Sequence, residues 1–189
     1  MTASPPERID LDNGTYLRWV TVDDAEPIAR AVGESLDHLT PWMPWAGAES
    51  ADPAFQRERL RNHPRQRDRR EEWQYGLFEA RDDAFLGAFG LMTRRGPGTL
   101  EIGYWVRVDA VGRGFATAAA RGLTGAGSRV DGIDRMIIAC DEANVRSAAV
   151  ARSLGYRLDR VEVRAPEAPG ESGRMQLWVH DEEDGTPNA

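Results

Sequence analysis

The segment from Tyr104 to Arg121, YWVRVDAVGRGFATAAAR, most strongly limits how this chain can fold. Its first residues are typical of a strand, a short glycine loop follows, and alanines at helical spacing continue to Ser128. A strand that enters a helix through glycines exposes unpaired backbone N–H groups at the positive end of the helix dipole. The sequence therefore predicts a phosphate site where this helix begins.

The residues around the loop favour the same interpretation. Gly112 and Gly114 lack a Cβ that would keep an anion away from the backbone, and Arg113 adds a positive charge. Neither GxGxxG nor GxxxxGK[ST] occurs, so neither a Rossmann dinucleotide site nor a P-loop is supported. A glycine turn that serves only the fold is the alternative.

The order of predicted elements indicates an α+β domain with three layers. A mixed, mostly antiparallel central sheet of six to seven strands should carry helices on both faces. We expect one domain over residues 1–189, with a core at about 16–180. The expected strands are 16–20, 73–79, 85–91, 100–108, 135–140, 156–163 and 175–180, and the expected helices are 22–32, 53–63, 115–128 and 145–154, with an irregular, docked segment at 35–46.

Composition excludes several classes of function. The net charge of −7 argues against direct nucleic-acid binding, and no apolar stretch is long enough for a membrane span. With no secretory signal at the start, the expected location is cytoplasmic. The single Cys140 reads as a buried strand residue, and His38, His63 and His180 are too scattered for a metal site or a hydrolase triad.

Three segments resemble the GNAT superfamily of N-acetyltransferases. Val111, Gly114 and Ala116 occupy its coenzyme A loop pattern, although Val111 replaces the usual polar first residue. Asn144–Tyr156, NVRSAAVARSLGY, is similar to its Asn motif and closing turn. Ser35–Trp45, SLDHLTPWMPW, looks like a segment of ribosomal-protein N-terminal acetyltransferases of the RimJ and RimL type.

This resemblance implies acetyl-CoA as cosubstrate, no metal, and a set of site residues. Acetyl-CoA would lie along the backbone of two strand residues, over the glycine loop and beside an asparagine. These residues are Val106, Val108, Gly112, Arg113, Gly114, Phe115, Ala116, Thr117 and Asn144. Asn144 also has an ordinary role as a helix cap.

The resemblance implies a catalytic role for Ser147. Glu101 is a second catalytic candidate because of its apolar neighbours in the sequence, with an exposed strand residue as the alternative, and two tryptophans are candidates for substrate contacts. Ser147 would lie near the thioester sulfur and protonate the departing thiolate, although a hydroxyl bonded to its own helix is the alternative. Glu101 lies among apolar residues, where burial should raise its pKa and make it a useful base. Trp42 and Trp45 are either amine-pocket walls or packing anchors.

The sequence thus predicts acetyl transfer by direct attack of a primary amine in a ternary complex, with a protein N-terminal α-amine as the main acceptor. A small amine or antibiotic is the first alternative. The second is a catalytically silent coenzyme A-binding module that grips an acidic partner with the arginines of 57–70, although these also read as a solvated surface. A homodimer is compatible with the sequence.

Overall fold

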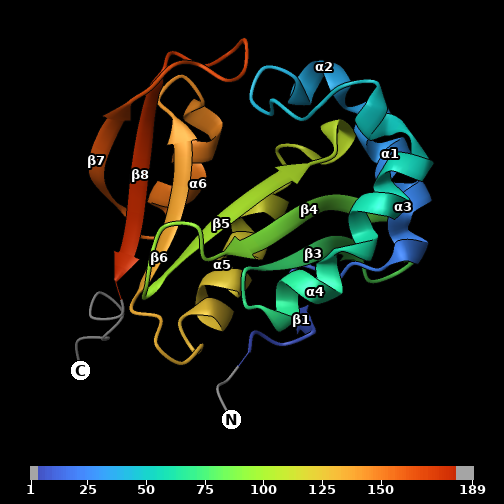
Figure 1. Cartoon of the computed structure of the whole chain (residues 1–189), viewed down its shortest axis with the longest axis horizontal. Coiled ribbons are helices and arrows are strands. Elements are labelled where there is room, and N and C mark those ends of the chain that lie inside the picture. The colour runs from blue at the N-terminus through green and yellow to red at the C-terminus, as the bar shows by residue number, and fades with distance from the viewer. Residues whose placement is uncertain (1–3, 182–189) are drawn as a thin grey trace.

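A computed structural model of the chain describes residues 4–181, which form one sheet with helices on both faces (Figure 1). The strand order within these residues is β1-β2-β3-β4-β5-β6-β8-β7. The strands are β1 (Arg8–Asp10), β2 (Thr15–Trp19), β3 (Glu72–Glu79), β4 (Phe85–Met92), β5 (Thr99–Val106), β6 (Arg135–Asp141), β7 (Arg157–Val163) and β8 (Arg174–Asp181).

The predicted α+β architecture is confirmed, with one strand more than the six to seven expected. The additional strand is β1, which pairs antiparallel with β2 through three residues, from Arg8 opposite Arg18 to Asp10 opposite Tyr16. Three residues are too few for alternation of polar and apolar side chains to stand out in a sequence.

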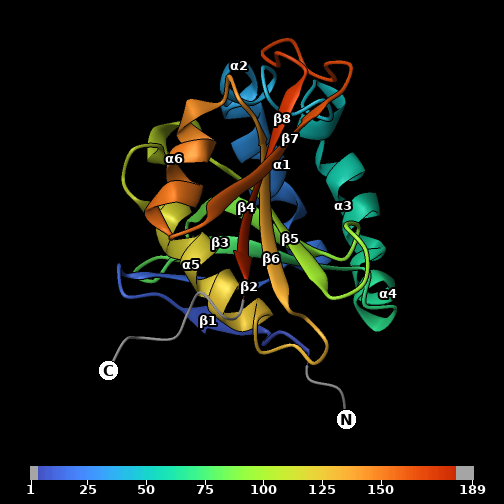
Figure 2. The ribbon, with the colours of Figure 1, turned by 90° about the vertical axis from the view of Figure 1, so that its left-hand side faces the viewer.

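Helices cover both faces of the sheet, as Figure 2 shows with the sheet turned toward its edge. On one face lie α5 (Phe115–Gly127) and α6 (Val145–Ser153). The other face carries α1 (Ala25–Glu34), α3 (Pro53–Arg61) and α4 (His63–Asp68), with the single turn α2 (Leu36–Leu39) at one end of the sheet. Three short 3-10 turns precede or link these elements: η1 (Val22–Asp24), η2 (Glu49–Ala51) and η3 (Val108–Ala110).

Local chemistry explains where the helices begin and end. Asp52 caps α3 by accepting a hydrogen bond from the Ala54 N–H at 2.7 Å. The helix predicted for 53–63 stops at Arg61 and α4 begins at His63. Pro64 has no N–H to continue the α3 ladder, which explains the break.

Each face of the sheet buries its own apolar cluster. Leu100, Ile102 and Met136 pack under α5 and α6, where Ala119, Ala120 and Leu123 are fully buried. The opposite face buries Phe78, Phe85 and Trp105 against α1 and α3. Alternation along β5 therefore directs Tyr104 and Trp105 to opposite faces.

Candidate active site

The sheet opens between β5 and β6, the two strands that run parallel. They pair from Thr99 opposite Arg135 only as far as Ile102 opposite Ile138, although β5 continues to Val106 and β6 to Asp141. A cleft of about 620 Å³ lies at this divergence and reaches both faces of the sheet. Its lining includes Trp42, Trp45, Glu101, Tyr104, Val106, Ala116, Cys140, Asn144 and Ser147.

The divergence leaves backbone groups of β5 without a strand partner. Arg107 donates its N–H to Leu86 of β4 at 2.8 Å. Because successive strand residues direct their N–H groups to opposite sides, the N–H of Val106 points away from β4, into the opening. Val108, predicted beside it, instead donates its N–H to the Ser35 hydroxyl at 3.1 Å and lies outside the cleft lining.

The α5 N-terminus has the free donors that the glycine loop predicted. Gly112 and Gly114 have positive φ angles of 80° and 78°, a backbone region that favours glycine. Gly114 is the N-cap and offers no capping side chain, and the first helical hydrogen bond runs from Ala118 to Gly114 at 3.0 Å. The N–H groups of residues 115–117 therefore have no helical carbonyl partner.

The other predicted loop residues lie around this N-terminus. Phe115 is buried in the core, and the Arg113 guanidinium lies 4.6 Å from its ring centroid. Thr117 is half-buried, and Ala116 is the loop residue that reaches the cleft lining.

On the α5–α6 face of the opening, two hydroxyl groups meet. The Tyr104 hydroxyl and Ser147 Oγ are 2.9 Å apart, and Asn144 caps α6 by accepting the Ser147 N–H at 3.2 Å. Burial raises the pKa of Tyr104 well above its ordinary value, so this hydroxyl keeps its proton. Cys140 lies beside this pair in the same cleft, and burial likewise raises the pKa of its thiol.

The expectation for the Glu101 pKa is wrong. Glu101 is buried as predicted, with 2 % exposure, and burial alone would raise its pKa. Arg94 and Arg95, however, both form ion pairs with its carboxylate, the second at 2.5 Å, and together they lower the pKa below its ordinary value. Glu101 therefore stays ionised and is a weak base.

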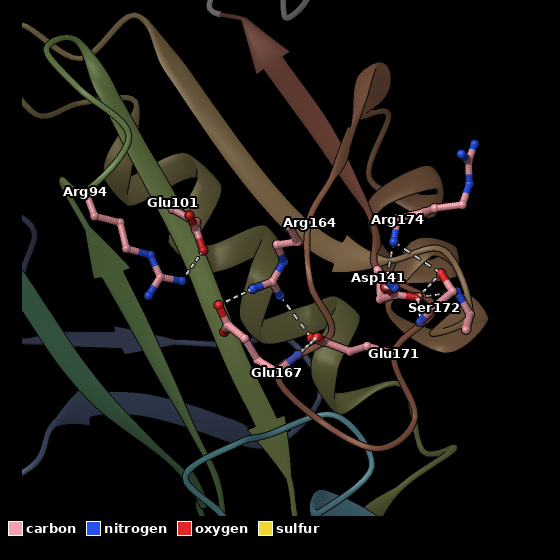
Figure 3. A network of polar contacts seen from close by, with 10 residues as sticks. Arg94, Glu101, Asp141, Arg164, Glu167, Glu171, Ser172 and Arg174 are labelled. Carbon is pink, nitrogen blue, oxygen red and sulfur yellow. Dashed lines mark hydrogen bonds and ion pairs between the residues drawn. The ribbon is translucent and has the colours of Figure 1, made fainter.

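A loop between β7 and β8 closes the cleft on the side of Glu101 (Figure 3). Within it, Arg164 contacts Glu167 at 2.5 Å and Glu171 at 3.0 Å. Asp141, at the end of β6, holds the loop in place by accepting the backbone N–H groups of Ser172 and Gly173, each at 3.0 Å. This dense hydrogen bonding lowers the Asp141 pKa.

The tryptophans lie at the side of the cleft opposite the hydroxyl pair. Trp45 is 43 % exposed, and its ring centroid is 6.1 Å from that of the buried Trp105. Trp42 is half-buried and lines the same cleft. Both expected roles, pocket wall and packing anchor, are compatible with these positions.

Several charged or titratable residues that line the cleft had no assigned role from the sequence, among them His38 and Arg59. His38, on α2, lines it, and burial together with the charge of Arg146 lowers its pKa below 6.5. Arg59, on α3, lines it as well. His38 lies in the segment 35–45 and Arg59 among the arginines of 57–70, but neither pattern indicates which residue faces the cleft, because both reach it through packing of their helices.

Among residues 4–181 no group of three or more His, Cys, Asp or Glu side chains could hold a metal ion, and no helix there is long and apolar enough to span a membrane. No curated protein matches the chain. Residues 15–157, well over half of the sequence, match the Acetyltransferase (GNAT) domain family.

The chain belongs to the GNAT acetyltransferase family. Solved structures show how widely this fold is shared. RimJ from Mycobacterium smegmatis, in complex with CoA-disulfide, has a TM-score of 0.86 at 22% identity, covering 97% of this chain and 91% of that one. A ribosomal-protein-S5-alanine acetyltransferase from Vibrio fischeri has a TM-score of 0.83 at 18% identity, covering 95% and 99%.

A third solved structure has a similar fold under a different name. The microcin C7 self-immunity acetyltransferase MccE, in complex with acetyl-CoA and AMP, has a TM-score of 0.83 at 19% identity, covering 93% of this chain and 97% of that one. At these identities the likeness extends to the fold, so the acceptor has to be argued from the cleft itself.

Proposed function

We propose that the chain transfers the acetyl group of acetyl-CoA to the α-amine of a protein or peptide N-terminus. The observation that carries this proposal is the opening between β5 and β6, which joins a cofactor side with uncapped helix donors to an open acceptor side. The S5-alanine acetyltransferase, which shares the fold, is by name an acetyltransferase of a ribosomal protein.

The residues on the cofactor side suit acetyl-CoA. The free N–H groups at the start of α5 would bind its pyrophosphate, since Gly112 and Gly114 allow close approach. The Val106 N–H in the opening would bind the pantetheine arm and stabilise the oxyanion, and Asn144 would contact the same arm.

The reaction needs one new bond, one broken bond and two proton movements. The amine nitrogen bonds to the thioester carbon, the carbon–sulfur bond breaks, the nitrogen loses a proton and the sulfur takes one. Ser147 would donate that proton to the sulfur, and the Tyr104 hydroxyl, 2.9 Å from Ser147 Oγ, would hold the serine hydroxyl in position.

The acceptor side requires a different proton acceptor from the one expected. Glu101 is ionised and engaged by Arg94 and Arg95, so it supplies a fixed negative charge. His38 is neutral at pH 7 because its pKa is lowered, and it faces the cleft. We assign it the role of taking the amine proton, directly or through water.

The test is thiol release from acetyl-CoA with a panel of N-terminal peptides and small amines, and mass spectrometry of each product. Acetylation at the α-amine of peptides supports the proposal. Turnover of small amines alone would transfer the assignment to that acceptor class, and cofactor binding without any product would indicate a silent module. Gly114→Glu, which puts a carboxylate in the pyrophosphate cradle, should abolish acetyl-CoA binding, with Gly125→Glu on the exposed side of α5 as control.

A further inference from the structure

Arg59 is the charged residue of the cleft whose surroundings explain it least. Its guanidinium is half-buried against the cleft, and its Nε is fully buried with no hydrogen-bond partner among residues 4–181. Loss of hydration lowers the Arg59 pKa, the direction expected of a desolvated cation that lacks an adequate anion. A desolvated guanidinium without a paired anion destabilises the protein when no acceptor is bound.

The other charges of the cleft are already compensated. Glu101 binds Arg94 and Arg95, and Arg164 binds both Glu167 and Glu171. Arg146 also lines the cleft, but it is exposed and hydrated.

The acid whose charge acts on Arg59 does not provide the missing hydrogen-bond acceptor. The charge of Glu72 acts on Arg59, but its two carboxylate oxygens accept hydrogen bonds from Gln66, at 3.1 Å, and from Gln74. On the same helix, by contrast, Arg57 pairs with Glu26 at 3.6 Å and Arg61 with Glu58 at 2.6 Å. Among residues 4–181, Arg59 therefore differs from these two arginines of its helix in having no ion pair within 4 Å.

The cleft extends across the sheet from the opening toward Arg59. Gln74 of β3, Gly90 of β4 and Gly103 of β5 are successive partners across the sheet, and all three line the cleft. Gly90 and Gly103 add no side chains of their own to the floor, and the flexible end of Met92 lies over Gly103, within 2.7 Å of where a Cβ would stand. From β5 to β3 the floor spans two strand spacings, or about 10 Å. About three residues of extended peptide cover that distance.

We propose that Arg59 is a specificity residue that binds an acidic side chain at position 2, 3 or 4 of the acceptor peptide, whose first residue carries the acetylated α-amine. This inference rests on the proposed function and names the acceptor class more closely. A carboxylate suits the guanidinium because it can accept two parallel N–H hydrogen bonds, and burial strengthens the pair.

The experiment compares peptides that start with serine and carry glutamate at position 2, 3 or 4, each beside a twin with glutamine at that position. For one of the three positions, kcat/KM should favour glutamate over glutamine by about tenfold or more. Arg59→Gln should reduce that ratio to about one, because kcat/KM falls more for the glutamate peptide than for its glutamine twin. Arg59→Lys should retain part of the ratio, since lysine keeps the positive charge but lacks the two parallel N–H donors of the guanidinium.

Arg61→Gln is the matched control, because Arg61 lies on the same helix but points to Glu58 in solvent. It should keep the full preference. An arginine that only supports the fold would change both peptides of a pair by the same factor, and that result would overturn the inference. Equal turnover of the glutamate and glutamine peptides by the unmodified protein would also overturn it. A preference for acidic acceptors that is seen only with small amines bearing a phosphate would do the same. If no peptide is acetylated at all, the proposed function itself fails.

Discussion

The Tyr104 hydroxyl lies 2.9 Å from Ser147 Oγ, although 43 residues separate the two along the chain. Tyr104 belongs to β5 and Ser147 to α6, so the pair spans the cofactor side of the opening. Neither hydroxyl serves the packing of the core in an obvious way, which makes the pair a good place to test the chemistry.

Removing the tyrosine hydroxyl should slow acetyl transfer more than it weakens binding. Tyr104→Phe is expected to lower kcat about tenfold and Ser147→Ala about 100-fold, with little change in the KM for acetyl-CoA, since proton donation to sulfur is affected. The double variant should resemble Ser147→Ala alone. Tyr156→Phe removes another buried tyrosine hydroxyl, which lies 2.8 Å from the Thr124 hydroxyl. This pair lies outside the cleft lining, so the variant should leave kcat intact. Additive losses in the double variant would contradict the assigned pair.

The dependence of rate on pH tests His38. Its lowered pKa means that the imidazole is neutral at pH 7 and becomes charged as the pH falls below that pKa. In the unmodified protein kcat/KM should therefore decline on the acid side, and His38→Gln should be slower at pH 7 and lose that part of the decline. Rates measured from pH 5 to pH 9 would show this, and an unchanged acid limb in the variant would exclude His38.

The contact between Gly170 and Pro41 should set the width of the acceptor side. The Gly170 N–H donates to the Pro41 carbonyl at 2.8 Å, and a Cβ at Gly170 would lie 2.6 Å from that oxygen. Gly170→Val must therefore push the loop after β7 away from the segment after α2. We expect a several-fold rise in the acceptor KM with the acetyl-CoA KM unchanged. Gly125→Ala, whose Cβ meets nothing within 4 Å, is the control.

Asp141 should matter for stability through the loop it holds. Its carboxylate accepts four backbone N–H groups, from Ala143, Ser172, Gly173 and Arg174, and the Ser172 hydroxyl. Asp141→Asn turns one acceptor oxygen into a donor that faces other donors, and should reduce the free energy of unfolding by about 2–3 kcal/mol. Urea unfolding would measure it, and Asp10→Asn at an exposed site should change little.

His63 should make the protein less stable in mild acid. It is buried with 3 % exposure, and burial together with Arg59 and Arg67 lowers its pKa to about 4. The unfolded chain, with a histidine pKa near 6.5, then binds more protons than the folded one. Stability is complete above pH 6.5 and decreases toward pH 4, by about 2 kcal/mol between pH 7 and pH 5. His63→Phe should remove this decrease, whereas His38→Gln should leave most of it.

Local patterns made the cofactor side largely predictable. The glycines before α5 and the Asn144 cap depend on neighbours within a few residues, and both appear where the sequence placed them. The Glu101 pKa was not predictable in the same way, because its direction depends on how a turn aims Arg94 and Arg95. Tyr104 meets Ser147 only because β5 and β6 run parallel, and Arg59 reaches the cleft only through the packing of α3.

The four paired residues of β5 and β6 and the Pro41–Gly170 contact lie at opposite ends of the opening. The two parts of the sheet on either side of the opening are thus joined by strand pairing at one end and by this contact at the other. An acetyl-CoA molecule bound in the opening would contact residues on both sides of it and so add interactions between the two parts of the sheet. Its binding is therefore expected to raise the melting temperature of the domain. Gly170→Val removes the contact with Pro41, so acetyl-CoA should raise the melting temperature of this variant by more than that of the unmodified protein.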